Sequence, residues 1–367
     1  MEKSLYFEYV EKYFPQLVVA FVEKLNDSNR PLSYMFRQLL TPRFSVDGRW
    51  ATITGSYTRV AAEVVAMDSP LPLIKRDAIE VQNGFVPKLG LKLFLNEKQM
   101  SDIDAMLGNG TAIDQVVNVI FEDTPKVIEG IYERIEYMFL LGLSTGVALA
   151  TNAEGNNSVG TRIKYGFKTE NQKGVSVVWH NNPTTCKPFD DIKKIMDKAD
   201  EDGNTIIRVY ADDQWIDDAC ASEQVRSYFA FALAGTTVAN ANTIPVLDRE
   251  QLNTVLERKY GITLVRVNRS VRTETNGVQK STKPWKAGSA TFVCDEQLGD
   301  LVWTNLAEST RPVNGVTYQT AADFILVSKY SVNEPALREF TASQARVVPV
   351  ISNVDRIYTL DSTIVQA

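Results

Sequence analysis

The chain has 367 residues, which is enough for about two or three compact units of ~100–200 residues each. Its 44% apolar and 23% charged residues are typical of a globular protein. The net charge of −6 argues against a basic face of the kind that reads nucleic acid. Its three cysteines form no CxxC pair, which excludes zinc-finger spacing and indicates free, buried thiols in a reducing compartment: Cys186, Cys220 and Cys294.

No targeting or membrane segment is expected. The apolar run Leu17 to Val22 is brief, follows several charged residues and precedes no small-residue cleavage site, so it is not a signal peptide. The longest apolar stretch, Tyr137 to Ala150, contains Ser144 and Thr145 and is shorter than the ~20 residues that span a bilayer. It predicts a buried helix.

Residues 1–43 predict an arm of short helices. Apolar residues recur at helical spacing from Leu5 to Phe14, and Pro15 is expected to end that helix. Two further short helices are expected, from Gln16 to Leu25 and from Pro31 to Leu40. Such helices bury little core alone, so the arm is expected to pack on something else.

From Phe44 to about Leu95 the pattern favours extended structure. Thr52, Ile53 and Thr54 are good strand formers, and prolines and glycines punctuate the segment as far as Gly90. We expect a long two-stranded excursion with an irregular tip. Because an isolated two-stranded ribbon is marginal in water, it should lean on a neighbour. Its mildly basic residues are read as a solvated face: Arg76, Lys88, Lys92 and Lys98.

The best helix signal begins at Thr124, a plausible N-cap that is followed by Pro125 in the first turn. An apolar stripe continues to Phe139, after which the segment is apolar all round. A helix over residues 124–151 would be roughly 42 Å long at 1.5 Å per residue and would act as a spine. Gly142 and Gly146 are expected to allow close packing or bending there.

The remaining chain predicts alternating helices and strands, hence a mixed α+β protein. Expected helices cover residues 188–199, 222–234 and 248–260, the last closed by Gly261. Expected strands cover residues 175–179, 205–210, 262–267 and 290–294, with further strands over residues 347–365.

The residues that carry chemistry are few. His180 is the only histidine, so His-based triads and metal sites are disfavoured, although a Cys186–His180 dyad remains formally possible. Tyr210–Ala211–Asp212–Asp213 mimics the YxDD motif of reverse transcriptases, which uses paired carboxylates to hold metal ions. That chemistry also needs a third carboxylate and a basic template channel. Asp217 and Asp218 are better explained as partners of the helix expected at Ser222.

No nucleotide-binding loop of the GxxxxGK[ST] or GxGxxG type occurs. A chain of this length without a cluster of titratable residues is more readily structural than catalytic. We therefore expect no catalytic, cofactor or metal site.

Several segments together resemble one family. Pro31–Phe36 is similar to its apolar segment before an extended loop, and Gly84–Lys88 to the turn on that loop's return strand. The segments that follow this loop in the family are similar to Trp179, Pro188–Ile192 and Ile206–Phe229. The closing run is the most specific part: Asn333–Pro335, Glu339–Thr341, Val348–Ile351 and Asp355–Ile357. Glu334 stands where Asp is common, and Asn353–Asp355 where Pro-Asp is common.

This order resembles the major capsid proteins of the lambda head-protein group, the capsid protein E family, which share the Hong Kong 97 fold. The resemblance covers roughly residues 30–365. It implies an N-terminal arm over residues 1–43 and an extended β-hairpin loop over residues 44–100. It implies a peripheral domain over residues 101–185 plus 331–367, containing the spine helix, and an axial domain over residues 186–330.

The resemblance also implies function. The chain would self-assemble into hexamers and pentamers of an icosahedral shell that encloses phage double-stranded DNA, bound non-specifically. Only about 43 residues precede the loop, so a separate scaffolding protein is expected, with a portal and a decoration protein as further partners. The location would be the virion, after assembly in the host bacterial cytoplasm. Candidate inter-subunit contacts are Phe36, Phe85, Pro87, Lys88, Gly142 and Gly146.

Three alternatives remain. An encapsulin-like nanocompartment shell would share the fold but house cargo enzymes. A tail-tube protein would be shorter and mainly β. A cryptic enzyme would need a cleft that gathers Asp212, Asp213 and a third carboxylate.

Overall fold

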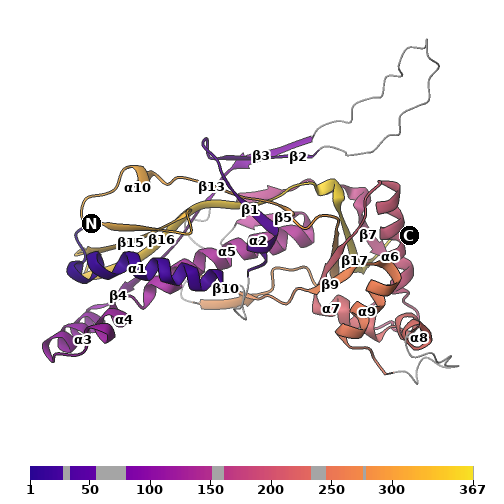
Figure 1. Ribbon diagram of the computed structural model, residues 1–367, viewed down its shortest axis with the longest axis horizontal. Coiled ribbons are helices and arrows are strands. Elements are labelled where there is room, and N and C mark those ends of the chain that lie inside the picture. Colours follow the sequence, from indigo (N-terminus) through magenta and orange to yellow (C-terminus); the bar gives the residue numbers. More distant parts are fainter. Residues whose placement is uncertain (28–33, 55–79, 151–160, 233–244, 276–277, 367) are drawn as a thin grey trace, which may run out of the picture. The chain divides into compact units, whose positions relative to one another are not determined.

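A computed structural model describes residues 1–27, 34–54, 80–150, 161–232, 245–275 and 278–366 (Figure 1). The fold mixes helices with sheets, as the sequence predicts, and divides into two compact units. The first unit contains residues 1–50, 84–138 and 300–350, and the second contains residues 51–83, 139–299 and 351–367. Among the described helices, none is long and apolar enough to cross a membrane.

The first unit is built on a six-stranded sheet in the order β1-β13-β16-β15-β14, with β4 also paired to β16. Its strands are β1 (Leu40–Phe44), β4 (Lys88–Leu95), β13 (Gly299–Thr304), β14 (Thr317–Ala321), β15 (Ile325–Val332) and β16 (Arg338–Ile351). β16 is antiparallel to both β4 and β15, so Phe340 lies opposite Phe94 on one side and Tyr330 on the other. These aromatic cross-strand pairs fix the register.

Helix α5 (Asp123–Thr145) packs closely on this sheet through its first half. Ser343 Oγ donates to the carbonyl of Val127 at 2.6 Å. A Cβ at Gly130 would lie 2.5 Å from Leu91 Cδ2, so a larger residue there would have to displace the Leu91 side chain. α5 belongs to the first unit up to Met138 and to the second from Phe139.

The predicted spine helix therefore exists, but both of its ends differ from the prediction. It begins at Asp123, which places Thr124 inside the first turn, where its hydroxyl is buried. It ends at Thr145 and not near residue 151, because Gly146 takes the left-handed conformation with φ +73. The chain then enters β5 (Val147–Ala150).

The arm is less broken than predicted. One helix, α1 (Phe7–Asn26), runs straight through Pro15. The prediction of two helices was wrong because the buried face of Val10, Phe14 and Val18 continues across the proline, which removes only one intrahelical hydrogen bond. Residues 28–33 lie outside the described residues. The other helices of this unit are α2 (Met35–Leu39), α3 (Glu97–Gly108), α4 (Ile113–Ile120) and α10 (Ala307–Thr310).

The second unit holds a five-stranded sheet in the order β7-β17-β12-β8-β9. Its strands are β7 (Gln172–Val175), β8 (Arg208–Ala211), β9 (Thr263–Arg266), β12 (Ser289–Val293) and β17 (Ile357–Val365). Its helices are α6 (Pro188–Glu201), α7 (Asp213–Ala221), α8 (Glu223–Ala232) and α9 (Arg249–Tyr260). The sequence predicted α6, α8 and α9 but not α7. Gly261 closes α9 with φ +70, as predicted. The core includes Trp179 and Trp215, whose ring centroids are 5.1 Å apart.

Three two-stranded ribbons complete the described structure: β2 (Arg49–Thr54) with β3 (Glu80–Phe85), β5 with β6 (Thr161–Lys164), and β10 (Val271–Thr275) with β11 (Val278–Thr282). The first is the stem of the predicted extended loop. The tip of that loop, residues 55–79, lies outside the described residues. The sequence did not predict the β10–β11 ribbon.

The two compact units divide the chain at other places than the predicted peripheral and axial domains, whose boundaries stay a prediction. Residues 300–330, expected in the axial domain, supply β14 and part of β13 and β15 to the first unit. The last strand, β17, was expected to return to the peripheral domain, but it pairs with β12 and β7 in the second unit. Long-range strand pairing sets which strands share a compact unit.

Candidate subunit interface

The stem of the β2–β3 ribbon presents an aromatic ring to solvent. Phe85 is 67% exposed, and the guanidinium of Arg49 lies 5.1 Å from its ring centroid. Beneath it, Trp50 is buried, and a Cβ at Gly84 would come within 2.8 Å of Trp50 Nε1. Trp50 therefore fixes the strand while Phe85 remains outside.

Two further apolar side chains lie at the base of this ribbon. Val46 is 89% exposed at the tip of a turn, and Phe44 is 44% exposed with its ring edge-on to Trp303 at 4.7 Å. The amide of Val86 donates to the carbonyl of Gly48 at 2.9 Å, which holds the turn beside the ribbon. We call Phe44, Val46 and Phe85 the loop-base surface. Exposed apolar side chains gathered in this way mark interaction sites.

Pro87 and Lys88 continue directly from this surface. The carbonyl of Pro87 accepts a hydrogen bond from the amide of Val347 at 3.3 Å. Lys88 is exposed, and its Nζ lies 3.1 Å from Glu308 Oε1. Both residues are thus held by their own chain, and Lys88 keeps a partly exposed charge next to Phe85.

Phe36 lies elsewhere, in the interior of the first unit. It is 1% exposed and packs against Tyr132, with ring centroids 5.7 Å apart. Its amide donates to Glu136 Oε2 at 3.1 Å. Its side chain is used for packing inside the subunit, so it is not available to a neighbour in this conformation.

Gly142 and Gly146 both lie in the second unit and have different roles. A Cβ at Gly142 would meet the Tyr165 ring at 2.5 Å, so this glycine permits the close packing that the sequence suggested. Gly146 ends α5 and does not bend it, and its carbonyl accepts from the amide of Tyr165 at 3.0 Å. Of the six candidates, only Phe85, Pro87 and Lys88 lie together on the surface.

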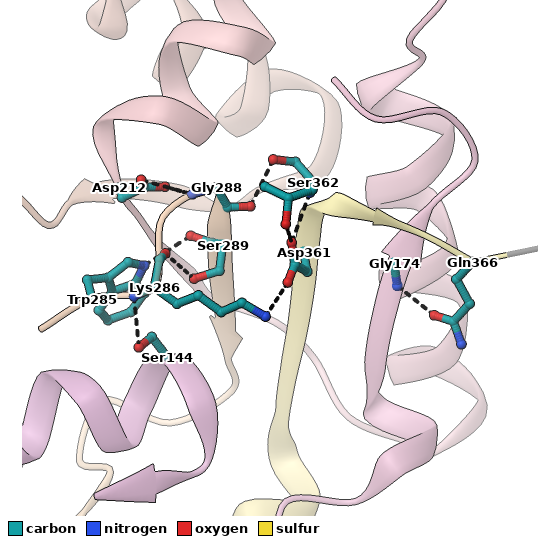
Figure 2. A network of polar contacts seen from close by, with 11 residues as sticks. Ser144, Gly174, Asp212, Trp285, Lys286, Gly288, Ser289, Asp361, Ser362 and Gln366 are labelled. Atoms are coloured by element: carbon teal, nitrogen blue, oxygen red, sulfur yellow. Dashed lines mark hydrogen bonds and ion pairs between the residues drawn. The ribbon is translucent and has the colours of Figure 1, made fainter. Parts of the chain in front are cut away.

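The YxDD-like motif is part of a structural network (Figure 2). Asp212 caps α7 by accepting from the amide of Trp215 at 3.2 Å. Its carboxylate also accepts from the amide of Gly288, at 3.0 and 3.1 Å. Burial raises the pKa of Asp212, and the backbone hydrogen bonds oppose that shift. The motif therefore joins a helix start to a loop.

That loop, residues 285–289, is anchored on its other sides as well. The amide of Lys286 donates to Ser144 Oγ at 3.2 Å, and its ammonium pairs with Asp361 (Figure 2). Ser362 Oγ and the Ser362 amide both donate to the carbonyl of Gly288 at 2.8 Å. The network ties the end of α5, the start of α7 and the strand β17 together.

A cavity of about 610 Å³ beside this network is lined by Asp212, Asp213, Asp217 and Asp218, with His180 and Lys283. Most of these carboxylates are already engaged. Asp213 pairs with Arg266, which lowers its pKa, and Asp218 Oδ1 lies 3.1 Å from His180 Nδ1. Within the described residues, no group of three or more His, Cys, Asp or Glu side chains could hold a metal ion. The arrangement does not favour metal-assisted chemistry.

Two details of the sequence interpretation change here. Asp217 and Asp218 lie inside α7 and do not cap the next helix, α8, where Ser222 Oγ accepts from the amide of Val225 at 3.3 Å. A Cys186–His180 nucleophile is also unsupported: burial raises the pKa of Cys186 to about 11, and His180 turns to Asp218. The three cysteines are free and buried, as predicted.

Sequence reasoning missed two buried charged side chains in the first unit, Lys329 and Glu339. Lys329 is fully buried, and its Nζ donates to the carbonyl of Ile120 at 2.8 Å and to Thr341 Oγ1 at 3.0 Å. Glu339 is also fully buried and accepts from Ser4 Oγ and the amide of Leu5. The sequence feature that could have indicated this burial is a single lysine within the otherwise uncharged strand β15.

Known proteins resemble this chain in sequence or in fold. The family model described as phage major capsid protein E matches residues 49–314. A putative capsid protein of an Escherichia coli CFT073 prophage is 12% identical, covers 95% of this chain and 98% of its own, and superposes with a TM-score of 0.57. A phage-related protein from Bordetella bronchiseptica RB50 is 11% identical, covers 96% and 98%, and gives 0.50. None of the curated proteins matches the sequence.

The family model spans well over half of the chain, and the first of these structures shares its fold over nearly the whole length. This favours a phage capsid over an encapsulin-like shell. The fold is Hong Kong 97-like, the role is to form a capsid shell, and the chain belongs to the phage major capsid protein E family.

Proposed function

We propose that the chain assembles into hexamers and pentamers that close an icosahedral shell around phage double-stranded DNA. The observation that carries this is the loop-base surface: Phe85 lies on a two-stranded ribbon that pairs with no third strand in the described residues, Phe44 and Val46 lie beside its base, and all three side chains are exposed. Such a ribbon is marginal alone, and a neighbouring subunit would bury it. Contacts of this head-to-tail kind close into rings.

In this proposal residues 1–43 form an arm and residues 44–100 an extended loop, and both contribute contacts to neighbouring subunits, although α1 and β4 also pack within their own subunit. Residues 101–185 plus 331–367 act as the peripheral domain. Residues 186–330 act as the axial domain at the centre of each ring. Phe85, Pro87 and Lys88 are the contact residues that the exposed surface supports. The role is structural and not catalytic.

The partners would be a separate scaffolding protein, a portal, a decoration protein and packaged DNA held non-specifically. Assembly would take place in the host bacterial cytoplasm, and the mature location would be the virion. The net charge of −6 supports weak attraction between subunit and DNA.

Sedimentation velocity on the purified chain, alone and co-expressed with the product of its upstream gene, tests this proposal. We expect particles far heavier than a 41.0 kDa monomer in at least one condition. A monomer or dimer under both conditions would contradict the proposal. Particles that copurify with a cellular enzyme as cargo would instead support the encapsulin alternative.

A further inference from the structure

Residues 1–5, which we call the strap, are bound by the sheet of the first unit. Glu2 and Ser331 of β15 exchange two backbone hydrogen bonds, at 3.0 and 3.1 Å, and Ser331 Oγ donates to the carbonyl of Lys3 at 2.7 Å. β14 covers the same edge of β15 only as far as Lys329, and the strap takes the next place along that edge (Figure 1). The strap thus lengthens this edge of the sheet before α1 begins.

A buried carboxylate holds the middle of the strap. Glu339 of β16 is fully buried and lies opposite Ser331 in the sheet. It accepts from Ser4 Oγ and, at 3.1 Å, from the amide of Leu5, and these are its donors in the part of the chain that the structure describes. Ser4 Oγ in turn accepts from the amide of Tyr6 at 3.2 Å. Because a buried carboxylate without donors is costly, Glu339 favours the closed strap.

The loop that leads into β14 also contacts the strap. A Cβ at Gly315 would lie 3.3 Å from the carbonyl carbon of Glu2 and from the amide nitrogen of Lys3. Gly315 has a φ of +88, a conformation that favours glycine. The strap therefore has contacts with this loop, with β15 and with β16, all within the first unit.

The strap and α1 are held by different forces. α1 packs through the buried face of Val10, Phe14 and Val18, and the Phe14 ring stacks on Phe121 with centroids 5.9 Å apart. Tyr6, the N-cap of α1, makes no side-chain capping hydrogen bond within the described residues. The strap is held by polar contacts at a chain end, and such segments open locally at a lower free energy than a buried apolar face.

We propose that the strap fastens the arm to its own subunit, and that it opens and closes on Glu339 without release of α1. Glu339 is a positioning residue: it binds the strap and places a negative charge near the start of α1, where the helix dipole favours one. The arm then meets a neighbouring subunit with the exposed side of α1, which includes Val19, and is not exchanged between subunits. This last step rests on the proposed function, whereas the strap itself requires no assembly.

Trypsin cleavage of the unassembled full chain after Lys3 measures the opening of the strap, because the Lys3 carbonyl is bonded to Ser331 when the strap is closed. Cleavage after Lys12, an exposed residue of α1, measures release of the helix. Glu339→Gln should raise the rate after Lys3 by at least about tenfold and leave the rate after Lys12 unchanged. Glu11→Gln removes the same charge from an exposed position in α1 and should change neither rate. Mass spectrometry identifies the products.

Ser4→Ala is the second variant, and it removes one of the two donors to Glu339 without a change in the sheet. It should raise the rate after Lys3 several-fold, measured relative to a peptide of residues 1–10 with the same substitution. Circular dichroism verifies that both variants are folded. Wild-type rates of cleavage in both variants would overturn the role of the carboxylate.

Dilution separates the two subunits that could hold the strap. Protection of Lys3 in the unassembled subunit, at a level that dilution does not change, supports fastening within one chain. Protection that falls on dilution, or that appears only in assembled particles, would overturn the proposal, because a neighbouring subunit would then hold the strap. Equal acceleration after Lys3 and Lys12 in Glu339→Gln would also overturn it, since strap and helix would open together. A chain that protects Lys3 but never assembles would contradict the proposed function and support the strap.

Discussion

Gly142 lies directly against the ring of Tyr165: a Cβ at position 142 would stand 2.5 Å from Tyr165 Cε2. The Tyr165 side chain is completely buried, so its ring has no open space to move into. The same burial raises the pKa of the Tyr165 phenol, which therefore stays protonated. The C-terminal part of α5 can therefore pack against Tyr165 only because residue 142 has no side chain.

Gly142→Ala should destabilise the subunit by about 1–3 kcal/mol, because overpacking a buried site forces neighbours to shift. Urea denaturation followed by circular dichroism measures this. Gly108→Ala is the matched control, since a Cβ there would meet nothing within 4 Å. Adding Tyr165→Val to the Gly142→Ala variant should recover part of the lost stability. Equal urea midpoints for the Gly142 and Gly108 variants would contradict the packing argument.

Gly146→Ala tests the helix end by a different mechanism. Its φ of +73 is left-handed, and an alanine there should cost roughly 1–2 kcal/mol in unfolding free energy. Gly146→Asn should cost less, because asparagine tolerates this conformation better. If the alanine variant unfolds at the same urea concentration as the wild type, the helix does not end at this residue in solution.

Asp212 and Asp213 are neighbours in sequence with different expected effects. Asp212→Ala removes the cap of α7 and the acceptor for Gly288, and should cost about 1–2 kcal/mol or more. Asp213→Ala removes a partly exposed ion pair with Arg266 and should cost under about 1 kcal/mol. Thermal denaturation of both variants, with and without Mg²⁺, distinguishes them. A wild-type melting temperature that rises with Mg²⁺ would revive the metal hypothesis.

Lys329 predicts a pH dependence with a definite sign. Burial lowers its pKa from 10.5 to about 8. Below pH 8 the amine is charged in both states, so the folded state bears the full cost of the buried charge. Between pH 8 and 10.5 the unfolded chain binds more protons, so the free energy of unfolding rises with pH.

The measurement compares wild type with Lys329→Met by urea denaturation at about pH 7 and about pH 10. The stability of the wild type relative to the variant should increase at the higher pH. Lys98→Met, at an exposed position, serves as the control for general charge effects. A relative stability that stays flat or falls would show that Lys329 is not buried as a cation.

Substitutions at Phe36 and Phe85 should have different effects, the first on the stability of the subunit and the second on its assembly. Phe36→Ala should cost about 3–5 kcal/mol of stability, because the side chain is buried. Phe85→Ser should cost about 1 kcal/mol or less, since only the contact with Arg49 is lost. We expect the Phe85 variant to remain folded and to lose particle formation. Normal particles from Phe85→Ser would remove it from the interface.

The sequence predicts helix starts, helix ends and buried helix faces well, because residues close together in the chain decide them. Pro188 at the start of α6, Gly261 after α9 and the apolar stripe of α5 all lie where the pattern placed them. Phe85 is exposed, because an aromatic residue beside a turn in a two-stranded ribbon has little of its own chain to pack against, and its role as a contact residue stays a prediction.

Other features could not be read locally. α1 continues through Pro15 because a buried face extends across it, and β17 joins the second unit because its partners β7 and β12 are remote in sequence. The buried position of Phe36 depends on Tyr132, and the role of Asp212 depends on Gly288. Each is set by a contact between residues far apart in the chain.

Negative-stain electron microscopy of the chain, expressed alone and with its upstream gene product, tests the central claim most directly. The account predicts round shells or rings with fivefold and sixfold symmetry in at least one condition. Well-dispersed monomers or small oligomers of folded protein in both conditions would contradict it.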